Sequence, residues 1–175
     1  ATPAFFGSFK VLKNHDLSVR AFYKRMFRMP TFNDLYYTDM GNAFLKPEYA
    51  EQFNVGLKYT RNFEKSPFMR MLDVSVDAYY NKITDKIIAY PKGQQFRWTM
   101  LNLGEVEIKG VDAVLNALFT LGKLEVTTKF QYTYQKAIDI TDPADTYYRD
   151  QIPYIPWHSG SAILALFYKG WGLNY

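Results

Sequence analysis

Apolar and polar residues alternate along several stretches of this chain, so that every second side chain is apolar. The alternation is plain in residues 17–24, 52–60, 72–80 and 124–135. In one of these stretches Phe53, Val55 and Leu57 are separated by Asn54 and Gly56. A period of two indicates a β-strand with one apolar face, because successive side chains on a strand point to opposite sides. These four stretches are therefore predicted strands.

Weaker strand patterns fill much of the remaining chain. Residues 5–12, 106–118, 157–168 and 171–175 bring the number of predicted strands to about eight, with no convincing helix. The phase of the alternation changes within 106–118, because Val106 and Ile108 share one parity and Val111 and Leu115 share the other. Gly110 lies at the change, which predicts a β-bulge or a kink in the strand there.

Short and long connections alternate between the predicted strands. The short ones are residues 13–16, 62–68, 120–123 and 169–170, and the long ones are 27–49, 82–97 and 139–155. An up-and-down antiparallel sheet with its tight turns at one end and its large loops at the other produces this rhythm. Such asymmetry is typical of outer-membrane β-barrels.

The alternation alone does not distinguish a barrel from a soluble β-sandwich. In a barrel the apolar face meets lipid, whereas in a sandwich it meets a protein core. Strands of about 10 to 14 residues, longer than the usual five or six, favour the barrel, as does the alternation of turn lengths. Tyrosines near the predicted strand ends also fit an aromatic girdle at a membrane surface: Tyr23, Tyr59, Tyr80, Tyr132 and Tyr134.

Composition narrows the chemistry further. Aromatic residues make up 18% of the 175 residues, which suits sheets and interfaces. The longest apolar run, about residues 162–167, is far short of the roughly 20 residues of a transmembrane helix. The absence of cysteine excludes disulfides and thiolate metal sites. The net charge of +4 is mild; it fits a solvated surface, with a basic funnel for an anionic ligand as the sharper alternative.

Few side chains are arranged for catalysis. His15 falls in a predicted tight turn, and His158 is followed by Ser159, whose side chain points to the opposite face of a strand. Asp73, Asp77 and Asp112 are expected on the polar face as part of a hydrated wall, with Lys58 and Lys129 nearby. No His or Asp cluster has metal-ligand spacing and no phosphate-binding glycine loop is present, so we expect no catalytic residue, metal or cofactor.

One long connection carries a motif in two parts. It reads Arg28-Met29-Pro30-Thr31-Phe32-Asn33-Asp34-Leu35-Tyr36-Tyr37, then Gly41-Asn42-Ala43-Phe44-Leu45-Lys46-Pro47-Glu48. The pattern R-x-P-T-F-N-E/D-L-Y … G-N-x-x-L-K-P-E resembles the TonB-dependent outer-membrane receptors. Residues 77–87, 102–112 and 152–160 resemble further strands of the same family, nearest its cobalamin- and siderophore-receptor branch. The resemblance covers nearly the whole chain.

The resemblance implies a fold and a mechanism. Such receptors are barrels of roughly 22 antiparallel strands whose lumen is filled by an N-terminal plug domain, which also carries the segment that TonB engages. Ligand binds at the extracellular face, and energy supplied through TonB remodels the plug. Residues 1–175 are then expected to be one segment of the barrel domain, internal to a longer protein, with the plug and the terminal strands lying outside it.

The same resemblance suggests two groups of residues. The motif residues are expected to shape the rim of the barrel: Arg28, Pro30, Asn33, Asp34, Gly41, Asn42, Pro47 and Glu48. Aromatic and cationic residues in or beside the long loops are candidates for ligand contact: Tyr36, Tyr37, Gln95, Arg97, Trp98, Tyr147, Tyr148 and Arg149. Cobalamin, a ferric siderophore, haem and a glycan all remain open as ligands.

The expected function is uptake of a large, scarce ligand across a bacterial outer membrane, with TonB, a plug and outer-membrane lipid as partners. Catalysis is not expected, nor is binding to nucleic acid. Three alternatives stay open: a plug-less porin or surface adhesin, a soluble β-sandwich that binds glycans, and an outer-membrane hydrolase that would depend on His158.

Overall fold

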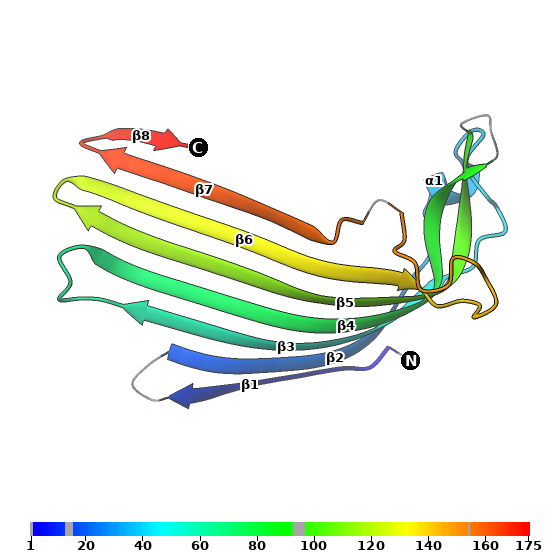
Figure 1. Ribbon diagram of the computed structural model, residues 1–175, viewed down its shortest axis with the longest axis horizontal. Helices are drawn as coiled ribbons and strands as arrows, with labels where there is room; N and C mark the ends of the chain where they lie inside the picture. Colours follow the sequence, from blue (N-terminus) through cyan, green and yellow to red (C-terminus); the bar gives the residue numbers. More distant parts are fainter. Residues whose placement is uncertain (1, 13–15, 93–96, 154) are drawn as a thin grey trace.

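A computed structural model describes residues 2–12, 16–92, 97–153 and 155–175. They form one sheet of eight antiparallel strands in which each strand pairs with its neighbours in the sequence (Figure 1). The strands are β1 (Ala4–Leu12), β2 (Asp16–Arg28), β3 (Glu48–Asn62), β4 (Met69–Lys92), β5 (Arg97–Leu121), β6 (Leu124–Asp139), β7 (His158–Tyr168) and β8 (Trp171–Asn174). The sheet is not closed. The predicted all-β class and up-and-down order are confirmed.

The short connections β3–β4, β5–β6 and β7–β8 lie at one end of the sheet, and the connections β2–β3 and β6–β7 lie at the other (Figure 1). β5 and β6 are joined through Gly122, whose φ of 64° suits a glycine, so that Leu121 pairs with Leu124. β7 and β8 are joined by Lys169 and Gly170, both with positive φ, as in the tight hairpin turns that match strand twist. Of the predicted turn at residues 13–16, residues 13–15, which include His15, lie outside the described residues, and Asp16 begins β2.

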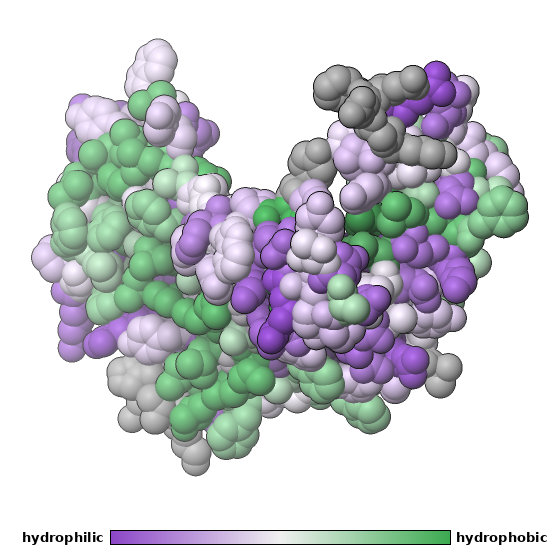
Figure 2. Space-filling model, turned by 45° about the vertical axis from the view of Figure 1, so that its right-hand side comes forward, coloured by the Kyte–Doolittle hydropathy of each residue, from purple (hydrophilic) through white to green (hydrophobic). Residues whose placement is uncertain are grey.

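The two faces of the sheet differ in chemistry. One face, here the apolar face, carries Phe53, Val55 and Leu57, whose exposed fractions are 46, 57 and 51%. The opposite face, here the polar face, carries ionic side chains such as Arg20 and Asp77. Figure 2 shows a broad apolar band beside a hydrophilic region, and a surface hollowed between two raised parts. Because the apolar side chains are exposed, no second layer of described residues covers that face.

β4 and β5 continue past the other strands as two paired arms, residues 85–92 and 97–104, here called the hairpin, which rise at the long-loop end in Figure 1. The predicted loop at 82–97 was therefore wrong for most of its length; residues 93–96 lie outside the described part. The pairing passes from Thr84 and Glu105 to Lys86 and Leu103, and the skipped Asp85 has a φ of 54°. The strand was not predicted because Asp85 and Pro91 are residue types that favour turns and loops.

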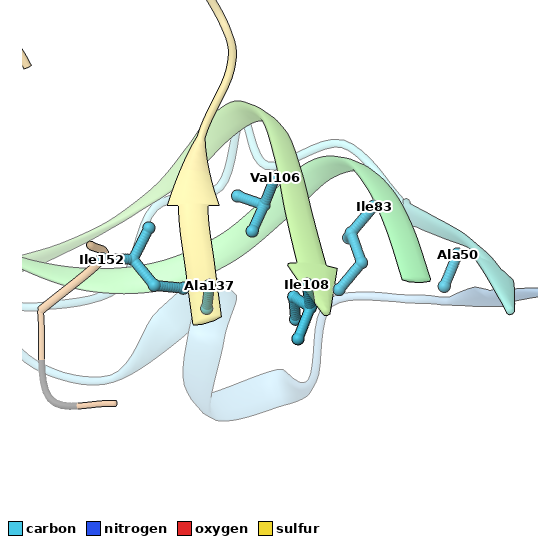
Figure 3. Packing of buried hydrophobic residues seen from close by; sticks show 6 residues of the cluster. All are labelled: Ala50, Ile83, Val106, Ile108, Ala137 and Ile152. Atoms are coloured by element: carbon cyan, nitrogen blue, oxygen red, sulfur yellow. The ribbon is translucent and has the colours of Figure 1, made fainter. Parts of the chain in front are cut away.

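The prediction of a bulge at Gly110 was also wrong. Gly110 pairs with Tyr79 on one side and Gln135 on the other, with no register shift. The phase changes because Val106 and Ile108 turn apolar side chains toward the polar-face side, where they join a buried cluster at the long-loop end (Figure 3): Ala50, Ile83, Val106, Ile108, Ala137 and Ile152. Ile152, from the connection between β6 and β7, covers this cluster.

Gly110 instead makes room for a ring. A Cβ at this position would lie 2.3 Å from the Tyr79 hydroxyl, which reaches across β5 to the Gln135 side chain of β6 at 3.4 Å.

One short helix is present where none was expected. α1 (Phe32–Tyr36) begins after Thr31, whose side chain accepts from the Asp34 backbone N–H while the Asp34 carboxylate accepts from that of Thr31. This capping box was the only sequence signal, since five residues are too few to show helical periodicity.

No helix among the described residues is long and apolar enough to cross a membrane.

Candidate functional site

Three segments gather at the long-loop end of the sheet and form the candidate site. They are residues 29–47 between β2 and β3, the hairpin arms at 85–92 and 97–104, and the described part of residues 140–157 between β6 and β7, which leaves out residue 154. Hydrogen bonds join the first and third segments to the hairpin and its base, so these connections are built as one layer.

The 29–47 segment is compact because of its motif residues. The Asn42 backbone N–H donates to the Asp34 carbonyl at 2.9 Å, and that of Gly41 donates to the Tyr37 carbonyl at 2.8 Å. Glycine is required at position 41 because a Cβ would lie 2.7 Å from the Leu35 carbonyl oxygen. The chain therefore folds back on α1 at this point.

This segment then lies against the hairpin. The Met100 backbone N–H donates to the Met40 carbonyl at 2.9 Å, and the Asn42 side chain donates to the Met100 carbonyl at 3.1 Å. The Asn102 side chain joins β5 to two other segments. Its amide oxygen accepts from the Lys46 backbone N–H at 2.8 Å, and its amide nitrogen donates to the backbone carbonyls of Lys46 and Asp85 at 3.1 and 2.7 Å. Asn102 thus ties the bend at Asp85 to the motif segment.

Two motif acids hold the base of the same layer. The Glu48 carboxylate accepts from the Ile87 backbone N–H at 3.0 Å and lies 3.6 Å from the Arg28 guanidinium. The same guanidinium lies 4.0 Å from the Asp34 carboxylate. Arg28 therefore bridges the end of β2, the α1 cap and the start of β3.

The 140–157 segment packs on the other edge of the hairpin base. The Thr141 hydroxyl accepts from the Glu105 N–H at 2.9 Å, and its methyl group lies where a Cβ at Gly104 would be only 2.3 Å away. The chain then returns beside β6, where the Ile152 N–H donates to the Ala137 carbonyl at 2.9 Å and the Gln151 side chain accepts from the Ala137 N–H at 3.0 Å.

A cavity of about 370 Å³ lies between the hairpin and this returning segment. Its lining is mostly apolar, with one cation: Lys86, Ile88, Ala89, Trp98, Ile152, Pro153 and Ile155. A concave, mainly apolar space with few polar groups is the usual form of a small-molecule site. This cavity can therefore hold an apolar part of a larger ligand.

The candidate ligand residues are spread over the loop layer. Tyr36 and Tyr37 lie at the end of α1, 60 and 59% exposed, and Tyr36 packs on the Phe32 ring at 5.1 Å. Arg97 and Trp98 begin β5, and only Trp98 lines the cavity. Tyr147, Tyr148 and Arg149 lie in the 140–157 segment, and Gln95 lies outside the described residues. The cavity thus brings one of the described candidates, Trp98, together with apolar residues of the hairpin and of the returning segment.

Sequence reasoning missed most of the cavity lining. Ile152, Pro153 and Ile155 belong to an apolar, proline-containing run inside an otherwise polar loop, and that contrast was the available signal. Lys86, Ile88 and Ala89 were missed because residues 82–97 were expected to be an irregular loop.

The polar face below the loops carries an ordered set of charges. The Nε and Nη2 atoms of Arg20 each donate to one carboxylate oxygen of Asp77. Asp112 pairs with Asp77 on the neighbouring strand β5, and its carboxylate accepts from the Thr133 hydroxyl at 2.7 Å. The Asp73 carboxylate lies 3.3 Å from the Lys58 ammonium. It also accepts from Thr60 and Asn116 at 2.7 and 3.2 Å. These side chains satisfy one another and leave no evident acid–base pair for catalysis.

Two further ion pairs lie where the strands reach the loop layer. The Lys82 ammonium is 2.8 Å from the Glu105 carboxylate, and its pKa is raised above the ordinary value chiefly by that hydrogen bond. Glu107 accepts from Lys109 at 2.7 Å and bonds the Tyr80 hydroxyl at 3.1 Å. The pKa of Glu107 is lowered, first by the bond to Lys109.

His158 is engaged on the apolar face. Its Nδ1 lies 2.7 Å from the Tyr132 hydroxyl, and its ring packs against Tyr134 with centroids 5.2 Å apart. His158 pairs with Tyr134 and Ser159 with Thr133, so their side chains point to opposite faces. This geometry provides no nucleophile–base pair. Among the described residues, no three His, Asp or Glu side chains are grouped to hold a metal ion.

Comparison with known proteins identifies a family. The family model described as TonB dependent receptor-like, beta-barrel matches residues 1–175. The chain is 34% identical over 99 residues to the vitamin B12 transporter BtuB of Vibrio vulnificus, which is 57% of this chain and 14% of that protein. It is 34% identical over 113 residues to the vitamin B12 transporter BtuB of Photobacterium profundum, which is 61% of this chain and 16% of that protein. The chain thus spans about a sixth of the length of these relatives.

Proposed function

The chain belongs to the TonB-dependent receptor-like β-barrel family, and from this premise we propose that it forms part of the wall and rim of an outer-membrane uptake receptor. The resemblance read from the motifs is thereby confirmed. The family consists of receptors and transporters, not enzymes, which removes the hydrolase alternative. The proposed protein spans a bacterial outer membrane, with residues 1–175 as one segment of its barrel.

The observation that carries this proposal is the open apolar face. Val55 and Leu57 are more than half exposed, although a soluble sandwich would bury such side chains under a second sheet. Contact with lipid removes the cost of exposing them to water, and the ionic polar face then lines the lumen. The row formed by Tyr23, Phe53 and Tyr80 marks the outer membrane surface, because aromatic residues concentrate at that depth.

The loop layer fits a receptor that presents a structured surface to its ligand. Residues 29–47 and 140–157 are hydrogen-bonded to the hairpin and its base, so the outer end carries a structured surface. A plug-less porin or a surface adhesin would also have loops, and only the presence of a plug domain in the complete protein separates those alternatives. We propose that a plug faces the charged polar face and that TonB supplies energy through it.

Cobalamin is the proposed ligand. The support is that both reported relatives are named vitamin B12 transporters and that the rim holds a cavity of about 370 Å³ with Trp98 in its lining. A large ligand would place only one part of itself there, with the exposed tyrosines and Arg97 nearby in the loop layer. A ferric siderophore and haem are the alternative ligands.

Uptake of labelled cobalamin by cells that express the complete protein tests this proposal. Uptake should be saturable, should stop when the proton-motive force is collapsed, and should require TonB. The Ala89→Trp variant fills the cavity and should weaken cobalamin binding by roughly tenfold. Ala43→Trp is the matched control, because Ala43 is exposed in the same layer outside the cavity lining. No uptake by a correctly assembled protein would refute cobalamin as the ligand.

A further inference from the structure

Two lysines lie directly opposite each other on the apolar face. Lys109 of β5 and Lys136 of β6 are Cα partners, and both follow the parity of Tyr80 and Tyr134 on that face. Like charges in directly opposed positions of a sheet repel and destabilise the pair. Lysines on a lipid-facing surface also carry a desolvation cost. An anion bound between the two lysines would reduce both the repulsion and the desolvation cost.

The two lysines are only partly compensated by the protein. The Lys109 ammonium lies 2.7 Å from the Glu107 carboxylate and 5.4 Å from the centre of the Tyr80 ring. The Lys136 ammonium lies 5.7 Å from the Trp157 ring, and it pairs with no carboxylate of the described residues. Only one of the two ammonium groups therefore has a carboxylate partner among the described residues. An ammonium group has three N–H donors, so both lysines can still donate hydrogen bonds to an added anion.

An apolar groove begins at Lys109. Its volume is about 460 Å³, and its lining is Phe53, Asn54, Val55, Ala78, Tyr79, Tyr80, Lys109, Gly110, Val111 and Tyr134. Ala78 and Val111 are partners across β4 and β5, and their small side chains leave a depression between the larger rings of Tyr80 and Tyr134. The groove is thus apolar along its length and cationic at the end nearest the loops.

We propose that this groove and the lysine pair bind a lipid whose headgroup carries a phosphate. One acyl chain lies over Ala78 and Val111 between the aromatic rings, and the phosphate lies between Lys109 and Lys136. Charge complementarity selects the anion, and the apolar groove selects an acylated ligand over a free phosphate. The lysines also lie in the row of Phe53 and Tyr80, at the depth of lipid headgroups.

The proposal rests on the assignment of the apolar face to lipid, but not on the identity of the transported ligand. Its test uses the complete protein in detergent, with bound lipid counted by native mass spectrometry. The probes are dimyristoyl phosphatidic acid, dimyristoylglycerol, which has the chains without the phosphate, and glycerol 3-phosphate, which has the phosphate without the chains. Uptake does not enter this assay, so its failure is distinguishable from failure of the transport proposal.

Phosphatidic acid should bind at least roughly tenfold more tightly than either partial probe, because only it satisfies both the lysines and the groove. Lys136→Gln should remove most of this preference, and Lys109→Gln with Lys136→Gln all of it. Ala78→Phe should weaken phosphatidic acid and dimyristoylglycerol alike by filling the groove. Lys129→Gln is the matched control, since Lys129 lies on β6 but on the polar face.

Two results would overturn the proposal. One is equal binding of phosphatidic acid and dimyristoylglycerol by the unmodified protein, which would show that the phosphate is not recognised. The other is an effect of Lys129→Gln as large as that of Lys136→Gln, which would show only a general response to charge.

Discussion

Arg20 of β2 forms an ion pair with Asp77 of β4 across the intervening strand β3, and the guanidinium Nε donates to one carboxylate oxygen at 3.0 Å. Gly56 is the residue of β3 that lies between them. A Cβ at Gly56 would fall 2.2 Å from the Asp77 Oδ1 and 2.9 Å from the Arg20 Nε. The absence of a side chain at position 56 is therefore what allows the ion pair to form on the polar face.

Gly56→Ala should lower the free energy of unfolding by about 1–3 kcal/mol, because the added methyl group has no room unless the ion pair separates. The unfolding free energy of the complete protein in urea measures this. Gly7→Ala is the matched control, because a Cβ at Gly7 meets nothing within 4 Å. In an Asp77→Ala background the cost of Gly56→Ala should fall to a few tenths of a kcal/mol. An unchanged cost in that background would contradict the explanation.

Phe130→Arg should block assembly in the membrane far more than Gln131→Arg. Phe130 is 53% exposed on the apolar face, whereas the next residue, Gln131, lies on the polar face opposite Ser161. An arginine facing lipid near mid-membrane costs roughly 2–4 kcal/mol, and a lumen position tolerates charge. The amount of heat-modifiable protein in outer-membrane fractions measures assembly. Equal assembly of the two variants would show that the faces are wrongly assigned.

Asn102→Ala should reduce ligand affinity while leaving assembly intact. The change removes the bonds from Asn102 to Lys46 and Asp85, which hold the motif segment against the hairpin. Because these bonds lie in the loop layer, the barrel wall should be unaffected. Ligand binding to the purified complete protein is the measurement, and Asn62→Ala, at the short-turn end, is the control. Affinity that survives Asn102→Ala unchanged would mean that the docked loop is not needed for binding.

Acidification should weaken the contact between Glu107 and Lys109. Lys109 lies in the same row as Tyr80, and Glu107 lies one step further toward the loop layer. The pKa of Glu107 is lowered below its ordinary value of 4.5, so the contact stabilises the folded state above that pH. This contribution is lost as the pH falls through the lowered pKa. The effect should be at most about 1 kcal/mol, because the Lys109 side chain is 58% exposed and lies at the proposed depth of the lipid headgroups, where water and ions screen the pair.

The melting temperature between pH 6 and pH 3 therefore should fall less for Glu107→Gln than for the unmodified protein. Glu125→Gln, near the short-turn end of β6, is the control and should fall as the unmodified protein does. Identical pH profiles for Glu107→Gln and the unmodified protein would mean that the ion pair contributes nothing.

The regular strands could be predicted from the sequence because their alternation of apolar and polar residues matches the apolar and polar faces of the sheet. Phe53, Val55 and Leu57 alternate with polar residues, and the strand that contains them has one face of each kind. The alternation gave a wrong prediction near Gly110, where the side of the sheet that is polar elsewhere carries a buried apolar cluster. Val106 and Ile108 turn apolar side chains to the side that is polar elsewhere, because Ile152 covers them there. The change of phase is visible in the sequence, but its cause is a contact with a residue far away in the chain, which the local pattern does not reveal.

The candidate site was only partly predictable for the same reason. The motif singled out Arg28, Gly41 and Glu48, and the structure shows the contacts of each at the long-loop end of the sheet. Their place at the rim of a barrel stays a prediction. Which aromatic residues meet the cavity depends on the bend at Asp85, a positive-φ position in a stretch that reads as a loop. Roles in ligand contact for Tyr36, Tyr147 and the others therefore stay predictions.

The central claim is that β3 and its neighbours form a membrane-spanning wall with lipid on the apolar face and the lumen on the polar face. Residues 1–175 contain no cysteine. Single spin labels are therefore placed at positions 54, 55, 57 and 58 of the complete protein in liposomes, after any cysteine outside these residues has been replaced. Collision rates with oxygen and with a water-soluble nickel chelate then report the surroundings of each label. We predict high oxygen and low nickel access at Val55 and Leu57, with the ratio reversed at Asn54 and Lys58. Equal access at neighbouring positions, or the opposite alternation, would contradict the claim.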